Sequence, residues 1–323
     1  MKFNANGKKM LLDNLVISAE AVAPMFIVMA VGVFVRRKGF INEQEVKRVN
    51  RLIFVVLFPA LMFSNLYGKE LSDAFNPRLA VFAVGMLAVV YFATVAFVLK
   101  VEKNPKSRGA MIQAIYRSNF VIMGIPIVSN IFGSDNLAVT SVMITIIVPI
   151  FNVLAVITLE IFRGGRPSPV HVISGIIKNP MIIGAVLGIF AAALKIKLPT
   201  FAENTVSMLA NAATPMALLI LGASFNIKSI EKEKRNLVIC LIGRLIVVPA
   251  VGLTAGVLAG FTDVALVTLV AIFAAPSAVS SFTMAQQMDS DGELAGACVI
   301  FSSMFSCLTM FGWIFALKSL GLF

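Results

Sequence analysis

The chain has 323 residues, of which 59% are hydrophobic and 13% are charged, and its formal net charge is +11. This composition excludes a soluble globular protein, because a surface that faces water needs many more charged side chains. The basic residues cluster in loops between apolar segments, so the positive charge does not indicate a nucleic-acid-binding protein. The composition therefore predicts a polytopic protein of the lipid bilayer.

Apolar stretches of about 20 residues, the length at which a helix crosses a bilayer, recur along the whole chain. The connections between them are short and leave no room for a separate soluble domain. We therefore predict an all-α membrane protein with ten transmembrane helices, at residues 12–35, 46–66, 79–100, 109–132, 137–162, 172–194, 204–226, 236–260, 263–287 and 294–317.

The basic residues are divided unevenly between the two sides of the predicted membrane. If the ten segments cross alternately, most of the 27 Lys and Arg side chains fall in the odd-numbered loops. Cytoplasmic loops of membrane proteins carry an excess of Lys and Arg. The pattern predicts a multi-pass protein of the cell inner (plasma) membrane, with odd loops in the cytoplasm and both termini extracytoplasmic.

An internal repeat aligns prolines of corresponding segments. A shift of 156 positions carries Pro24 onto Pro180 and Pro59 onto Pro215, and a shift of 150 carries Pro126 onto Pro276. Each half holds five spans, an odd number, so the second half enters the membrane the opposite way up. The sequence thus predicts two inverted five-helix repeats, at residues 12–162 and 171–318, related by a pseudo-two-fold axis in the membrane plane.

Two of the predicted spans carry a helix-breaking residue in the middle. Pro126 interrupts the fourth span and Pro276 the ninth. Proline removes a helical hydrogen bond that lipid cannot replace. A matching pair of interrupted spans is a sequence indication of a transporter's binding site. We expect the two broken helices to cross near the bilayer midplane, with ordinary proline kinks as the alternative.

Such a crossing would form a small polar site. Each second half-helix would point its free N–H groups at the crossing, which suits an anionic group, and each first half-helix would offer carbonyls to a cation. The amide of Asn119 can hold a carboxylate, whereas Ser277 is equally suited to contact a ligand or to bond a freed carbonyl. The candidate substrate-binding residues are Asn119, Met123, Gly124, Pro126, Pro276, Ser277 and Ser280.

Ionisable residues at membrane depth are functional candidates by default. Glu20 is a candidate for ion or proton coupling. Glu160, Lys178 and Arg244 lie near predicted span ends, so we expect them to extend to the interface. Arg117 lies one turn from the basic end of the fourth span, where it could extend to the interface or guide anions inward. No metal, cofactor or catalytic motif is recognisable, so we expect no cofactor, no metal site and no enzyme.

Several of these apolar segments resemble those of a known family, the auxin efflux carriers. The run Asn119-Phe-Val-Ile-Met-Gly124-Ile-Pro126 resembles the family's fourth-helix signature. Further resemblances lie in the second helix (Asn50 to Pro59), the seventh (Met216 to Gly222) and the ninth (Ala275-Pro276-Ser277, then Phe282 and Gln286). The long cytoplasmic loop of many plant members is absent, so the chain is similar to the compact bacterial members.

The resemblance implies a ten-helix fold like that of bile-acid and sodium/proton antiporters, in which spans 1, 2, 6 and 7 form a scaffold. Spans 3–5 and 8–10 would form a mobile transport domain that works by elevator-type alternating access. The implied substrates are organic anions such as malate, malonate or auxin, and Asn119 falls on the family's substrate-binding asparagine. The residues after Pro276 differ from those of many plant members, which favours a substrate smaller and more polar than auxin.

The leading hypothesis is therefore a secondary transporter of a small organic anion. Coupling to H⁺, coupling to Na⁺ and flow driven by the membrane potential all stay open, as does assembly into a homodimer. The alternative is a transporter-like membrane receptor that binds an anionic ligand without moving it. The expected partners are the substrate and the lipid bilayer, with no nucleic acid.

Overall fold

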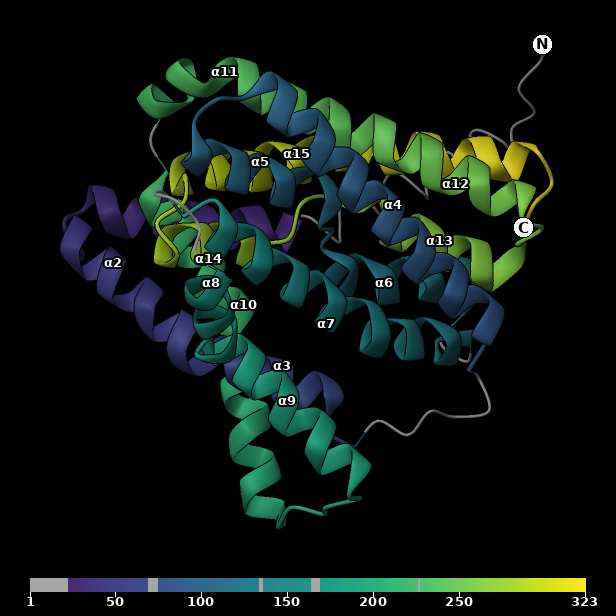
Figure 1. Cartoon of the computed structure of the whole chain (residues 1–323), viewed down its shortest axis with the longest axis horizontal. Coiled ribbons are helices and arrows are strands. Elements are labelled where there is room, and N and C mark those ends of the chain that lie inside the picture. The colour runs from purple at the N-terminus through teal and green to yellow at the C-terminus, as the bar shows by residue number, and fades with distance from the viewer. Residues whose placement is uncertain (1–22, 69–74, 134–135, 164–168, 226) are drawn as a thin grey trace.

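The computed structural model describes residues 23–68, 75–133, 136–163, 169–225 and 227–323 (Figure 1). In these residues the chain is helical, without a strand, so the prediction of an all-α protein is confirmed. The elements are a helix at 23–37, α2 (Glu43–Leu52), η1 (Ile53–Leu57), α3 (Phe58–Leu66), α4 (Pro77–Val101), α5 (Pro105–Tyr116), α6 (Phe120–Phe132), α7 (Ala138–Ile161), α8 (Pro169–Ile177), α9 (Pro180–Ala193), α10 (Thr200–Ser224), α11 (Ile227–Ile242), η3 (Gly243–Val247), α12 (Val248–Leu258), α13 (Asp263–Ala274), α14 (Ser280–Gln287) and α15 (Gly292–Ser319).

Within the described part of the chain, 6 helices are long and apolar enough to cross a membrane. They are Glu43–Leu66, Pro77–Val101, Ala138–Ile161, Thr200–Ser224, Glu233–Leu258 and Gly292–Ser319. The predicted spans 4, 6 and 9 are each divided between two shorter helices, α5 and α6, α8 and α9, and α13 and α14. These lengths and compositions agree with a multi-pass membrane protein.

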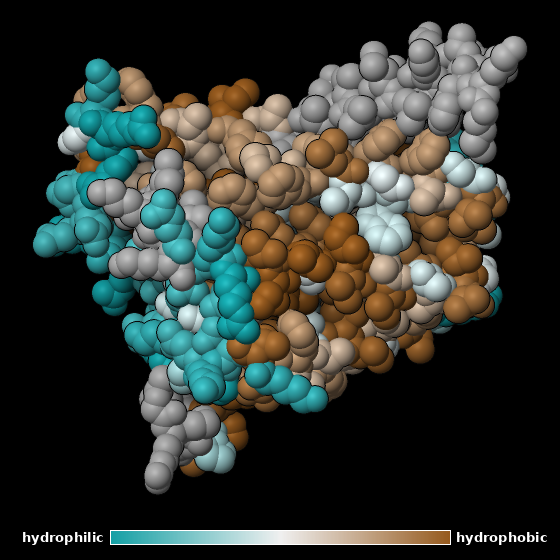
Figure 2. All heavy atoms as spheres, turned by 90° about the horizontal axis from the view of Figure 1, so that it is seen from above, coloured by the Kyte–Doolittle hydropathy of each residue, from teal (hydrophilic) through white to brown (hydrophobic). Residues whose placement is uncertain are grey.

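The surface separates into a hydrophilic end and a broad hydrophobic face (Figure 2). Exposed large apolar side chains of the protein include Val81, Phe92 and Leu258, which are 75%, 66% and 83% exposed. Lipid is the solvent that such a surface fits, because a contiguous apolar face of this extent is rare on soluble monomers.

Polar contacts join several loops at one end of the molecule. Ser107, at the start of α5, donates to Asp291 at 3.0 Å, and Arg163, after α7, contacts Asp289 at 3.1 Å. At the same end Asn236 of α11 donates to Glu102 at 2.6 Å. The odd-numbered loops after predicted spans 3, 5 and 9, and the start of span 8, are therefore neighbours, as alternating crossings require.

Glycines allow the closest approaches between helices. A Cβ atom on Gly32, in the helix 23–37, would lie 2.0 Å from the carbonyl oxygen of Leu219 in α10. A Cβ atom on Gly188, in α9, would lie 3.0 Å from the carbonyl oxygen of Phe63 in α3. The shift of 156 positions carries Gly32 onto Gly188 and Phe63 onto Leu219. The two halves of the chain thus make corresponding contacts, each with the other half.

We expect Gly32→Ala to destabilise the protein, because backbone faces the new methyl group and cannot move aside as a side chain can. Overpacking of this kind costs roughly 1–3 kcal/mol. Gly85→Ala in α4 is the matched control, since a Cβ there meets nothing within 4 Å. Alanine should leave that helix as stable or more stable by up to about 1 kcal/mol. Thermal unfolding in detergent measures both, and equal midpoints would contradict the packing argument.

Two helices end in the interior and restart after a short extended segment. α5 ends at Tyr116 and α6 begins at Phe120, while α13 ends at Ala274 and α14 begins at Ser280. Pro276 lies in the second interruption, as expected. Pro126, however, lies inside α6, so the expectation that it marks the interruption of the fourth span was wrong. α6 continues through Pro126, whose missing N–H leaves the carbonyl of Ile122 without its usual helical partner.

Candidate functional site

The two interruptions lie side by side and are joined by backbone hydrogen bonds. The N–H of Asn119 donates to the carbonyl of Pro276 at 2.7 Å, and the N–H of Ala278 donates to that of Arg117 at 3.3 Å. Between them Ser118 and Ser277 form an isolated antiparallel bridge. Backbone groups that leave a helix in the apolar interior need partners in the protein. The two interruptions supply these partners to each other, which holds four helix ends at one place.

A small cavity of about 80 Å³ lies beside this crossing. Residues of α3, α7 and α10 form part of its wall, and residues 117–122 and 278–280 form the rest. Among the residues described as lining it, Arg117 is the one ionisable side chain, so the wall carries no carboxylate. The first residues of α6 and α14 both face the cavity, and the positive ends of these helix dipoles add to the guanidinium charge.

Arg117 is buried, with 3% of its surface exposed, and its hydrogen-bond partners are neutral. It donates to Gln113 Oε1 at 3.1 Å, to Ser280 Oγ at 2.7 Å and to Asn152 Oδ1. It also lies 3.0 Å from the sulfur of Met284. None of the ion pairs found among the described residues includes it. Arg117 therefore does not extend to the interface, and within the described part of the chain it is a buried cation without a carboxylate partner.

Further hydrogen-bond donors at the cavity have no partner among the described residues. They are the buried amide nitrogens of Asn119 and Asn65 and the buried hydroxyl of Ser118. Asn119 is 7% exposed, and its side chain does not cap α6. A buried polar group without a partner costs about 1–3 kcal/mol, so these donors call for an acceptor. A guanidinium, two amides and a hydroxyl together suit an oxyanion such as a carboxylate.

Two of the sequence-predicted site residues, Asn119 and Ser280, line the cavity. The hydroxyl of Ser280 accepts a hydrogen bond from Arg117. Ser277 does not line it: its hydroxyl donates to the carbonyl of Ala114 at 2.8 Å, and its N–H donates to Ser302 Oγ at 3.0 Å. Of the two roles predicted for Ser277, the contact with a freed carbonyl is the one observed here.

The other predicted site residues lie around the crossing without reaching the cavity wall. Met123 is buried in the apolar core, and Gly124 packs against the ring of Phe120. Pro126 is in the second turn of α6, and Pro276 takes part in the crossing through its carbonyl. A separate candidate, Glu20, lies outside the described residues.

Sequence reasoning missed four polar residues of the cavity wall, namely Asn65, Ser118, Asn152 and Thr214, and it left the orientation of Arg117 open. A sequence signal was present at Ser118, because Arg117 and Ser118 directly precede Asn119 in an otherwise apolar segment. Asn65 and Asn152 come from α3 and α7, and only the packing of these helices brings them to the crossing.

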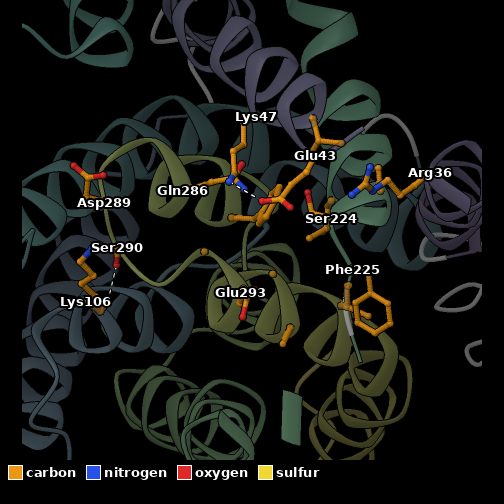
Figure 3. A pocket seen from close by; sticks show the side chains of 18 residues that line it. Arg36, Glu43, Lys47, Lys106, Ser224, Phe225, Gln286, Asp289, Ser290 and Glu293 are labelled. Atoms are coloured by element: carbon orange, nitrogen blue, oxygen red, sulfur yellow. Dashed lines mark hydrogen bonds and ion pairs between the residues drawn. The ribbon is translucent and has the colours of Figure 1, made fainter. Parts of the chain in front are cut away.

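A larger cavity of about 570 Å³ opens at the hydrophilic end of the molecule (Figure 3). Charged side chains from several elements face it, among them Arg36, Glu43, Lys47 and Glu293. α14 connects the two cavities, since Ser280 at its start lines the small one and Gln286 near its end lines the large one. There Asn50 of α2 donates a hydrogen bond to Gln286. The two cavities thus lie toward opposite ends of α14.

The chain matches the family model described as "Membrane transport protein" over residues 17–167 and 168–314. It is 24% identical to an uncharacterized transporter of Methanocaldococcus jannaschii, over 92% of this chain and 99% of the relative. It is 22% identical to an uncharacterized transporter of Methanothermobacter thermautotrophicus, over 92% of this chain and 97% of the relative. A protein of Rhizobium meliloti named "Putative malonate transporter" is also 22% identical, over 92% of this chain and 95% of the relative.

Proposed function

The chain belongs to the membrane transport protein family, the auxin efflux carriers, and from this premise we propose that it is a secondary transporter of a small organic anion. The family is one of membrane transporters and not of enzymes. The observation that carries the proposal is the buried Arg117, which has no carboxylate partner among the described residues and lines the same cavity as Asn119, whose amide nitrogen is unbonded. A carboxylate would satisfy both groups at once.

The size of the cavity and the likeness to the relative named "Putative malonate transporter" both favour a compact carboxylate as the substrate. A volume of about 80 Å³ suits a molecule with few non-hydrogen atoms better than one with an indole ring. The relative from Rhizobium meliloti is named for malonate. Malonate and malate are therefore the first substrates to test, with the auxin indole-3-acetate as the larger comparison.

For the architecture, we propose ten spans arranged as two inverted repeats, with the two interrupted helices crossing near the bilayer midplane. The corresponding glycine contacts, Gly32 with Leu219 and Gly188 with Phe63, support the pairing of spans 1 and 2 with spans 6 and 7. These four spans are the proposed scaffold, and spans 3–5 and 8–10, which carry the crossing, are the proposed transport domain.

An elevator movement requires the transport domain to slide past the scaffold. Across the proposed boundary Asn50 bonds to Gln286, and Asn152 donates to the sulfur of Met62. Thioether sulfur is a weak acceptor. Both of these contacts join neutral groups, which supports the small sliding motions of packed helices.

For the orientation, we propose that the hydrophilic end, with the large cavity, faces the cytoplasm of the inner (plasma) membrane and that both termini face outward. The basic odd-numbered loops support this arrangement. An anion that leaves the cell then moves down the membrane potential, which contributes about 2.3 kcal/mol per charge per 100 mV. Coupling to H⁺ or Na⁺ is therefore not required for export.

Counterflow of labelled malonate in proteoliposomes tests the proposal. Vesicles loaded with unlabelled malonate or malate should accumulate the label transiently, whereas empty vesicles without protein should not. In parallel, malonate should raise the unfolding temperature of the detergent-purified protein by mass action. Binding without counterflow would favour the membrane receptor, and no response to any small carboxylate would overturn the proposed substrate class.

We expect Asn119→Ala to weaken malonate binding, because the substrate loses a buried donor that no protein group now uses. The loss of one such hydrogen bond to a charged acceptor is about 1.5–3 kcal/mol, or roughly 10- to 100-fold in Kd. Asn211→Ala is the control, since Asn211 is exposed on α10. Isothermal titration gives both constants, and an unchanged Kd in Asn119→Ala would remove this residue from the site.

A further inference from the structure

A second buried arginine lies at the crossing, on the side where α5 and α13 end. Arg244, in η3, has 0% of its surface exposed. Its Nη1 donates to the carbonyls of Ile115 at 3.1 Å and Tyr116 at 3.0 Å. Its Nη2 donates to the carbonyls of Ile272, at 3.3 Å, and Phe273. The expectation that Arg244 extends to the interface was therefore wrong, because the side chain is fully buried.

These four carbonyls belong to the last turns of the two interrupted helices. The last carbonyls of a helix lack intrahelical partners and carry the negative end of the helix dipole. Two such ends meet here in the buried interior, around the fully buried Arg244. This is the place at which the sequence led us to expect carbonyl groups able to hold a cation.

The guanidinium of Arg244 fits this place by shape as well as by charge. Its two terminal nitrogens present four N–H groups in one plane, and each nitrogen serves the end of one helix. A lysine ammonium has three donors on a single nitrogen and cannot span both ends in this way.

The backbone around Arg244 is held by its own contacts. Gly243 packs against the side chain of Ile115, and the indole N–H of Trp313 donates to the carbonyl of Leu245 at 3.1 Å. The wide π-helical turn of η3 inserts one residue relative to an α-helix, a feature found frequently at functional sites. Packing and helix geometry together direct the arginine at the crossing.

We infer that Arg244 is a built-in cation of the transport site: it neutralises the two helix C-termini permanently, in the place of a dissociable metal ion. The two arginines then have opposite roles on the two sides of the crossing. Arg244 satisfies carbonyls of the protein, and Arg117, the residue after Tyr116, is left for the substrate anion. The role of Arg244 in transport rests on the proposed function. Its role as a tethered cation, meaning a positive charge that its own side chain holds at the two helix ends, does not.

Chemical rescue in detergent tests the tethered cation without any transport assay. Arg244→Ala should unfold at a lower temperature than the wild type, and millimolar guanidinium or Na⁺, compared with choline at equal ionic strength, should raise that temperature. The wild type should not respond. Arg235→Ala is the matched control, because Arg235 on the preceding helix is exposed and donates to the carbonyl of Val101; this variant should not respond either.

Two more variants keep the inference falsifiable if Arg244→Ala does not fold. Arg244→Lys preserves the charge and Arg244→Gln removes it, so the lysine variant should be the more stable of the two. Equal stability of these variants, or an Arg244→Ala protein that small cations do not stabilise, would overturn the tethered cation.

In proteoliposomes, replacing Na⁺ by choline should leave malonate flux of the wild type unchanged. Flux of Arg244→Ala should be lower by about tenfold or more, the ratio that corresponds to 1.4 kcal/mol, and guanidinium should restore part of it. A wild type that moves no carboxylate would overturn the proposed function and leave the thermal rescue intact. Wild-type flux that requires Na⁺ would overturn the role of Arg244 in place of a metal ion.

Discussion

Replacing Arg117 by glutamine is expected to abolish malonate binding, with a loss of at least roughly 100-fold in Kd, since each of the two parallel charge-assisted hydrogen bonds that a guanidinium can make to a desolvated carboxylate contributes about 1.5–3 kcal/mol. Arg117 is the one cation of the cavity wall described here, so no neighbouring charge can take over its role. Binding measured by isothermal titration, together with counterflow, provides the readout.

The stability of the same variant separates a binding role from a structural one. In the ligand-free protein Arg117 is a buried charge held by neutral acceptors only. Removing an uncompensated buried charge relieves its desolvation, so the unfolding temperature of Arg117→Gln should not fall below that of the ligand-free wild type. Malonate should raise the wild-type unfolding temperature and leave that of the variant unchanged.

Arg117→Lys is the informative companion variant. It keeps the charge and loses the planar fork that can bind a carboxylate through two parallel hydrogen bonds. We expect affinity between those of the wild type and the glutamine variant. A glutamine variant that binds malonate as tightly as the wild type would exclude Arg117 from the site.

The apolar segments predicted the helical class and the approximate spans, because the length of an apolar run is a local property of the sequence. The place of the first interruption, in contrast, depends on contacts between segments that are far apart in the chain. Sequence reasoning placed it at Pro126, the residue with the strongest intrinsic effect on a helix, whereas the chain leaves the helix at Arg117. Residues 117–119 leave the helix where their backbone bonds to residues 276–278, a pairing between segments far apart in the chain.

The same distinction separates the site residues that were predicted from those that were missed. Asn119 and Ser280 lie within the two recognisable segments and line the cavity. The depths of Arg117 and Arg244 were estimated along continuous helices, and both helices depart from that geometry, one by an interruption and the other by a π-helical turn. Glu160 was also expected to extend to the interface, but it is 6% exposed and contacts Arg163 at 3.5 Å. Lys178, for which the expectation was the same, is exposed.

A chemical cross-link between the proposed scaffold and the proposed transport domain should stop malonate flux. Asn50 of α2 and Gln286 of α14 are hydrogen-bonded across that boundary, so cysteines at these two positions lie within reach of a short bifunctional maleimide. The background for the pair replaces the native cysteines, Cys240, Cys298 and Cys307, by alanine. Flux after cross-linking should fall to that of protein-free vesicles.

The matched control is a hydrogen-bonded pair within the proposed scaffold. Tyr67, after α3, donates to Glu203 of α10 at 2.7 Å, and cysteines at these positions can be cross-linked by the same reagent. That cross-link should leave flux nearly unchanged, because a scaffold does not change shape while the other domain slides past it.

Malonate binding, measured on the protein cross-linked between positions 50 and 286, separates a blocked movement from a damaged site. An elevator fixed at one end of its travel still presents its site to that side, so binding should persist while flux is lost. Loss of both would mean that the reagent distorts the site. Undiminished flux through fully cross-linked protein would contradict the elevator, since substrate would then cross the bilayer without relative movement of α2 and α14.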